Sequence, residues 1–447
     1  MNSPLDSTSE RTRLAGLVAL GAVQVTIYGV LAIWEAYQTR PQIAMLLALL
    51  AFAFYLAALV TARRLSGRRA FAVAIAFGLA FRILLFPEAP FLSDDYFRYL
   101  WDGIVQLKGL NPYRFAPSDP ALAGIDDALR ARVNHPEVRT IYPPLAQLVF
   151  LVTAKVSAGS YFALKAVWLA CDIGIAVLLY RLVAEERRLQ AWMLYWWSPL
   201  VVIEVYWNAH LDLLGVAFVV VLLALAKQSP IKSHAIGVAV AAASLIKYFA
   251  VAFLPAAART GRSLRAAAAF SSVVALLSVP YASSGVANMF EGLLTYAQHW
   301  RFNAGLYRVL EWALFSSTLA KAMAAAVVLL VVANSVRNRW SIERTLFWVT
   351  GTALVLSPTV HPWYLLWMVP LLAVRPNRGW IFLNGSVFLA YYGLGSFRAS
   401  GVWPEPWWLQ SMIYGPFFVL LLTDAWRGSW WQAARDAIRI APASRDV

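Results

Sequence analysis

The chain has 447 residues, of which 61% are hydrophobic and 14% are charged, and its formal net charge is +15. Soluble domains have roughly 25% charged residues, so this composition excludes an ordinary soluble protein. Apolar runs of about 17 to 25 residues recur along nearly the whole sequence, and this length crosses a hydrocarbon core. We therefore expect one all-α polytopic membrane domain over residues 1–447, with about fourteen membrane-crossing or broken helices.

Basic residues lie in short connectors between the apolar runs, at 63–69, 181–188, 227–232, 259–265, 337–344 and 375–378, and in a tail over residues 427–447. The positive-inside rule places these connectors, the tail and both termini in the cytoplasm. The intervening connectors, 87–160, 206–211, 283–308, 357–362 and 396–408, then face outward. Charge distributed in this way indicates membrane orientation and no nucleic-acid partner. The single cysteine, Cys171, excludes a disulfide within the chain.

The large first outer connector, 87–160, begins with acidic and aromatic residues. Its sequence FLSDDYFRYLWDG predicts an amphipathic helix on the membrane surface, because Asp95, Arg98 and Asp102 would share one face. Ser93 or Asp94 is a suitable cap for this helix. The turn sequence GLNPY, at 109–113, would end it.

Two later apolar runs do not suit simple crossings. The run 143–158 has about sixteen residues, and a crossing there would reverse the sidedness of every later basic connector, so we expect a re-entrant or membrane-surface helix. The run 235–259 has two ends that both look cytoplasmic. We expect two short helices there, with a turn near Lys247 on the outer side.

Four motifs in order, SDDYFRYLWDG, GLNPY, HPEVRTIYPPL and HPWYLLW, resemble the GT-C superfamily of membrane glycosyltransferases. The resemblance is to the polyprenol-phosphate-mannose-dependent enzymes of glycosyltransferase family 87; it covers most of the chain by topology and is strongest over residues 93–145. It implies transfer of a sugar, most often mannose among relatives, from a polyprenyl-phosphate donor to an acceptor on the outer side. Many relatives space their acids as D-x-D, whereas Asp94 and Asp95 are adjacent here, which leaves two alternatives for the catalytic acid.

The residues of the outer connectors suit this chemistry. A carboxylate must take the proton from the acceptor hydroxyl while cationic or hydrogen-bonding groups hold the leaving phosphate, and a direct displacement inverts the sugar carbon. Asp95 or Asp94 would be the base, and we favour Asp95 because it falls on the polar helix face while Asp94 caps. The predicted phosphate or substrate ligands are Arg98, Asp102, Tyr142, His210, Asp212, Lys247, His299, Arg301, His361 and Tyr364.

Several of these ligands also have a purely structural interpretation. Lys247 and Arg301 could extend their charged tips from helix ends toward the membrane surface. His210 and Asp212 could form a simple contact at the end of a helix. Tyr364 is typical of an interfacial aromatic belt.

No cofactor is required by these motifs. A divalent metal held by Asp94, Asp95 and His361 is conceivable, although no spacing demands one. The alternative function is a multipass secondary transporter or lipid-linked-sugar flippase, whose ionisable groups would lie near the bilayer midplane and not at one face. The expected partners are a polyprenyl-phosphate-linked sugar, membrane lipids and a glycolipid, polysaccharide or protein acceptor. The expected location is the bacterial inner or plasma membrane, with the active site on the extracytoplasmic face.

Overall fold

The computed structural model describes residues 4–34, 40–260 and 262–426, and these residues are helical apart from connectors and one isolated parallel bridge between Phe302 and Thr359. The predicted basic tail, 427–447, lies outside the described residues. The α-helices are α1 (Pro4–Ile33), α3 (Pro41–Ala62), α4 (Gly67–Leu85), α5 (Asp95–Leu107), α6 (Asp127–Arg130), α7 (Pro144–Val156), α8 (Tyr161–Leu182), α9 (Arg188–Trp196), α10 (Pro199–Val201), α11 (Asp212–Leu225), α12 (Ser233–Ser244), α13 (Ser263–Ser278), α14 (Val286–His299), α15 (Gly305–Leu314), α16 (Ser317–Arg337), α17 (Ile342–Val355), α18 (Val369–Val374), α19 (Arg378–Ser386), α20 (Leu394–Ser400) and α21 (Trp407–Trp426). The 3₁₀ helices are η1 (Pro120–Leu122), η2 (Glu185–Arg187), η4 (Tyr248–Thr260), η5 (Val279–Ser284), η6 (Pro362–Trp367) and η7 (Val387–Gly393), and η3 (Val202–Trp207) is a π-helix.

Five helical segments among the described residues are long and apolar enough to cross a membrane. They are Glu10–Ile33, Pro41–Ala62, Tyr161–Leu182, Ser263–Ser284 and Ser317–Arg337. A helix rises 1.5 Å per residue, so segments of this size span about 30 Å of hydrocarbon. The chain is therefore an integral membrane protein. Four shorter apolar helical segments lie among the described residues: Pro144–Val156, Asp212–Leu225, Ser233–Ser244 and Pro362–Val374.

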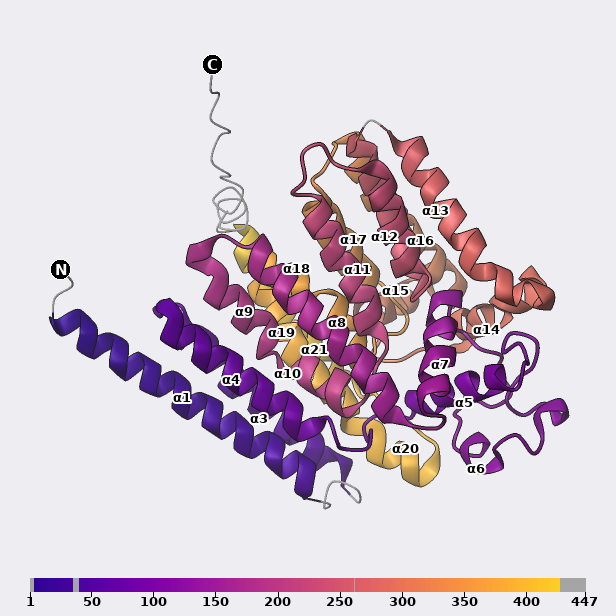
Figure 1. The fold of residues 1–447 in the computed structure, drawn as a ribbon, viewed down its shortest axis with the longest axis horizontal. Helices are drawn as coiled ribbons and strands as arrows, with labels where there is room; N and C mark the ends of the chain where they lie inside the picture. Colours follow the sequence, from indigo (N-terminus) through magenta and orange to yellow (C-terminus); the bar gives the residue numbers. More distant parts are fainter. Residues whose placement is uncertain (1–3, 35–39, 261, 427–447) are drawn as a thin grey trace.

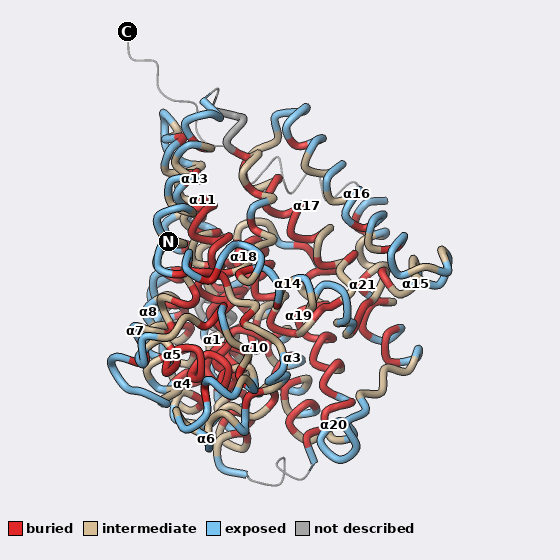
Figure 2. The backbone as a smooth tube through the Cα atoms, turned by 90° about the vertical axis from the view of Figure 1, so that its right-hand side faces the viewer, coloured by how far each residue is buried: buried red, intermediate tan, exposed pale blue. Residues whose placement is uncertain are grey.

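The helices lie side by side, with α1, α3 and α4 together at one flank and α5, α6 and α20 at one end (Figure 1). Buried residues follow the central helices, whereas α13 and α16 expose most of their length (Figure 2). Because these two helices are apolar, such exposure is expected where a helix faces lipid tails. The centre contains fully buried indole rings, among them those of Trp168, Trp197 and Trp367.

An ion pair inside the bundle joins α4 to α8. Nε of Arg82 lies 2.6 Å from Oδ2 of Asp172, and both side chains are buried. The hydroxyls of Tyr195 and Tyr206 each donate to this carboxylate at 2.5 Å. Charges within a membrane protein are costly unless paired, so this network stabilises the packing of the central helices.

Both of the unusual apolar runs form short helical segments. α7 has 13 residues, too few to span a bilayer, and it packs against α5. α12 ends at Ser244 and η4 begins at Tyr248, so the chain turns at Lys247. Both expectations of short helical segments are confirmed.

The expectation that α5 lies on a surface is wrong. The helix begins at Asp95, as the sequence indicated, but residues 96–105 are all buried. Its polar face is turned into the protein because Arg98 and Asp102 pair with each other at 2.9 Å, and Asp102 also accepts hydrogen bonds from Thr140 and Gln147. The polar periodicity was therefore a sign of an internal network and not of solvent.

Candidate functional site

A cavity of ≈ 940 Å³ lies among the described residues, at the end of the bundle that contains the start of α5. Every connector predicted to face outward contributes to its wall, through residues within 88–143, 211, 293–302, 357–361 and 397–403. Nine of the twelve predicted site residues line it: Asp94, Asp95, Arg98, Tyr142, Asp212, Lys247, Arg301, His361 and Tyr364. The structure thus brings together side chains that are more than 250 positions apart in the sequence.

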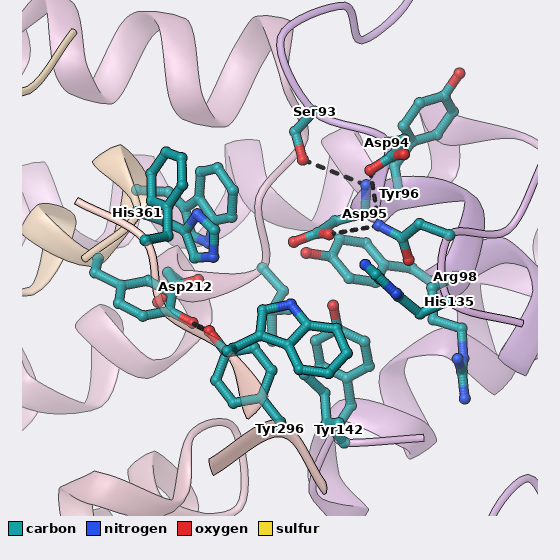
Figure 3. Close-up of a pocket in the computed structure, with 18 of the residues that line it drawn as sticks. Ser93, Asp94, Asp95, Tyr96, Arg98, His135, Tyr142, Asp212, Tyr296 and His361 are labelled. Atoms are coloured by element: carbon teal, nitrogen blue, oxygen red, sulfur yellow. Dashed lines mark hydrogen bonds between the residues drawn. The ribbon is translucent and has the colours of Figure 1, made fainter. Parts of the chain in front are cut away.

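The two adjacent acids share one hydrogen-bond donor. Nδ2 of Asn134 donates to Oδ1 of Asp94 at 2.7 Å and to Oδ1 of Asp95 at 3.2 Å (Figure 3). Asp94 occupies the N-cap position of α5, but its side chain makes no capping hydrogen bond. The Ser93 hydroxyl instead accepts from the backbone N–H of Asp95 at 3.3 Å. Both carboxylates therefore stay directed toward the cavity and Asn134.

Asp95 has the electrostatics of a base that works near neutral pH. Burial raises its pKa from 3.8 to about 7, and the charge of Asp94 acts in the same direction. The hydrogen bond from Asn134 and the charge of Lys247 lower the pKa of Asp95, which limits the rise. A base whose pKa lies near the working pH combines the correct protonation state with the strongest proton transfer.

Asp212 lies across the cavity from the acid pair (Figure 3), and Lys247 is a further lining residue that contacts it. Oδ1 of Asp212 accepts from Nζ of Lys247 at 2.6 Å and from Nε1 of Trp367 at 2.7 Å. The ammonium group also lies 3.5 Å from the ring centroid of Tyr364, whose hydroxyl is 2.8 Å from that of Tyr296. Lys247 is therefore anchored at the cavity wall by Asp212 and Tyr364.

Stacked rings hold His361 in the cavity wall. Its imidazole stacks on Trp363 with 4.3 Å between centroids and on Phe302 with 4.6 Å. Trp363 also stacks on His210 at 3.8 Å. His210 itself does not line the cavity, and its Nε2 lies 3.4 Å from Oε2 of the buried Glu204. The predicted role of His210 as a cavity residue is therefore not matched by the structure, which places it beside Glu204.

The remaining predicted ligands have other partners. Arg98 lines the cavity, but it pairs with Asp102 and donates to the backbone carbonyl of Val138 at 3.0 Å. Asp102 lies behind the wall in the network described above. His299 is exposed outside the cavity, and Arg301 lines the cavity while pairing with Glu311.

The sequence interpretation missed several polar residues of the wall. They are Arg132, Asn134, His135, Arg139 and Arg398. The HPEVRTIYPPL motif contains two of them, and Asn134 directly precedes it, so the signal was present. What the sequence does not show is that the loop folds back onto the start of α5.

The three conceivable metal ligands do not form a metal site in this arrangement. Across residues 4–34, 40–260 and 262–426, no group of three or more His, Cys, Asp or Glu side chains is placed to hold an ion. Asp94 and Asp95 accept from an amide, and His361 lies within stacked rings.

Comparison with known proteins gives two matches to family models. One, described as "Alpha-(1->6)-mannopyranosyltransferase, N-terminal domain", matches residues 13–260, more than half of the chain. The other, described as "MptB C-terminal domain", matches residues 303–391. No curated protein and no solved structure matches the chain. The first match contains the acid pair and the second contains His361 and Tyr364.

Proposed function

Because the chain belongs to the α-(1→6)-mannopyranosyltransferase family, and is thus a mannosyltransferase dependent on polyprenyl-phosphate mannose, we propose that the cavity around Asp94 and Asp95 is its transfer site. The observation that carries this proposal is the convergence of all the predicted outer connectors on one cavity, with two carboxylates at its wall. Family membership also replaces the alternative hypothesis of a transporter or flippase.

We propose Asp95 as the base that takes the proton from the acceptor hydroxyl. As that proton leaves, the hydroxyl oxygen forms a bond to C1 of mannose, and the bond from C1 to the phosphate oxygen breaks. The bonding electrons leave with polyprenyl phosphate. Attack and departure occur on opposite faces of the sugar, so C1 inverts. An α-linked product then requires a β-linked phosphate donor.

The leaving phosphate needs positive or donor groups on the side of the cavity away from the base. His361, Lys247 and Arg301 line the cavity and serve this purpose in our proposal, as the sequence suggested. Arg398 is a further cation of the wall, and it lies 4.1 Å above the ring of Phe91. Tyr142, Asp212 and Tyr364 complete the substrate contacts. Arg98, Asp102 and His210 act through the packing that supports these residues.

The same proposal fixes the orientation in the membrane. Connector 87–160 is the catalytic loop on the extracytoplasmic face of the plasma membrane, and the chain crosses or re-enters the bilayer in about fourteen segments. The acceptor is a glycolipid, polysaccharide or protein that presents a primary hydroxyl to Asp95. In this orientation, the lipid-linked donor reaches the cavity at the outer surface of the membrane.

The test is a reconstituted reaction. The purified protein is incubated with β-linked polyprenyl-phosphate mannose carrying a label and with a membrane lipid extract, and the product linkage is determined by NMR. We expect an α-(1→6)-mannoside from the wild type and from Asp127→Asn, which changes an exposed acid of the same loop. Equal product from the Asp94→Asn/Asp95→Asn double variant would contradict the assignment of the site.

A further inference from the structure

The amide of Asn134 makes an unusual bridge between two like charges. Its two N–H groups serve the two neighbouring carboxylates, at 2.7 Å for Asp94 and 3.2 Å for Asp95. The orientation of the amide follows from this geometry, because its oxygen in the same place would face two carboxylate oxygens. The hydrogen bond from Asn134 favours the ionised form of Asp95.

The loop that carries Asn134 is fixed to the helix that carries the acids. On one side of Asn134, the guanidinium of Arg132 lies 4.0 Å above the ring of Phe97. On the other side, Arg98 donates to the carbonyl of Val138 at 3.0 Å. Phe97 and Arg98 belong to the first turn of α5, so the loop and the acids form one unit.

The residue after Asn134 is held in a strained conformation. His135 has φ +46°, in the left-handed region that non-glycine residues adopt at a cost of order 1–3 kcal/mol. Its imidazole packs edge-on against Trp300, with 4.5 Å between centroids. This contact joins the first outer connector to the one after α14, and it keeps the loop turned so that Asn134 faces the acids.

We infer that Asn134 is a positioning residue for the acid pair, an inference that rests on the proposed role of these acids. Its amide holds the two carboxylates side by side, so that Asp95 presents its second oxygen to the acceptor. Without the amide, two adjacent carboxylates repel each other and turn apart or share a proton. The base would then be misplaced or protonated at neutral pH.

The other ionisable groups around Asp95 do not replace this amide. They are Asp94, Tyr99 of α5, Tyr142, Asp212 of α11, Lys247 after α12, Tyr296 of α14, Tyr364 of η6 and Tyr391 of η7. Lys247 is the cation of this set, and it is already bonded to Asp212. The tyrosines surround the acid pair as neutral hydroxyls. The direct donor contact to both acids therefore comes from Asn134.

The experiment compares Asn134→Ala and Asn134→Asp with wild type. Both variants remove the donor, and the second adds a third carboxylate of nearly the same shape. We measure kcat, the KM for polyprenyl-phosphate mannose, thermal stability and the pH dependence of turnover. The matched control is Lys108→Gln, which removes an exposed charge of the same connector at the far end of α5.

A positioning role predicts a fall in kcat of about ten- to a hundred-fold at pH 7 in Asn134→Ala, since bonds to charged groups contribute at this level, with the donor KM unchanged. The acid limb of the pH profile shifts to higher pH by about one unit in Asn134→Ala and further in Asn134→Asp. The control Lys108→Gln keeps the wild-type profile. Turnover of Asn134→Ala recovers at high pH. Unchanged turnover in both variants, or loss at every pH together with lowered thermal stability, would refute the inference. Either result leaves the proposed function standing if the acids themselves are essential.

Discussion

The side chains of Asp212 and Lys247 meet at 2.6 Å across the turn that follows α12, with Lys247 covering the ring of Tyr364 at 3.5 Å. This pair joins the first residue of α11 to the turn between two broken helical segments. The side chain of Asp212 is 1% exposed and that of Lys247 26% exposed, so the carboxylate depends on its partner for charge compensation.

Removal of the lysine charge alone should destabilise the protein. Lys247→Met leaves Asp212 buried and unpaired, and breaking such a pair costs about 3–5 kcal/mol. The double variant Lys247→Met/Asp212→Asn removes both charges and should recover part of this loss. Thermal unfolding in detergent is measured for the wild type, the single variant and the double variant. A double variant no more stable than Lys247→Met would show that the two charges do not compensate each other.

The comparison needs an exposed ion pair as its control. Arg301 pairs with Glu311, and its side chain is 58% exposed. Exposed pairs contribute about 0–1 kcal/mol, so Arg301→Ala should unfold close to the wild-type temperature.

Turnover should depend on the protonation of Asp95. Because its pKa is raised to about 7 and the reaction needs the carboxylate, kcat/KM should rise with pH through about 7 and level off above it.

The stability of the protein should change with pH in the opposite sense. In the folded protein the pKa of Asp95 is about 7, whereas the ordinary pKa of its carboxyl is 3.8. The free energy of unfolding should therefore fall as the pH rises from about 4 to about 7 and stay level above that. Asp95→Asn should remove this loss, and a pH series of unfolding temperatures checks it.

Substitution of Arg98 should mainly affect stability, whereas substitution of His361 should mainly affect turnover. Arg98→Ala removes the partner of the buried Asp102, so we expect a lowered unfolding temperature. His361→Ala should keep the fold and reduce transition-state stabilisation by about 2.7–4 kcal/mol, as for the loss of one donor to a leaving group. Turnover and unfolding are measured on both variants. Wild-type turnover in His361→Ala would remove this residue from the phosphate site.

Much of the candidate site could be predicted because residue chemistry and the distribution of basic residues can be read from short stretches of sequence. The SDDYF stretch indicated two carboxylates at the start of a helix, and α5 begins there. The outer location of that helix, inferred from the distribution of arginine, stays a prediction. The two short segments on either side of Lys247 followed from their basic flanks. The burial of α5 was not predictable, because a polar face looks the same whether it meets water or the internal partners Thr140 and Gln147. The bridge from Asn134 also depends on a loop path that no periodicity describes.

The sidedness of the proposed catalytic loop can be measured by labelling. In a Cys171→Ala background, we expect an impermeant thiol reagent to modify Ala123→Cys on intact cells and to leave Ala184→Cys unmodified. Both positions are exposed, on connectors predicted to be outside and inside. Asn134 is unsuitable as a labelling position, because it bonds both acids. Modification of the second position but not the first would reverse the topology.

The most direct test of the proposed site is the transfer of labelled mannose by Asp94→Asn and Asp95→Asn. An amide keeps the size of each side chain but cannot take the proton from the acceptor hydroxyl. We predict that Asp95→Asn abolishes transfer while donor binding and thermal stability are retained, and that Asp94→Asn retains measurable transfer. Loss in Asp94→Asn alone would exchange the two roles. Near-normal turnover in both variants would contradict the assignment of this acid pair as the catalytic centre.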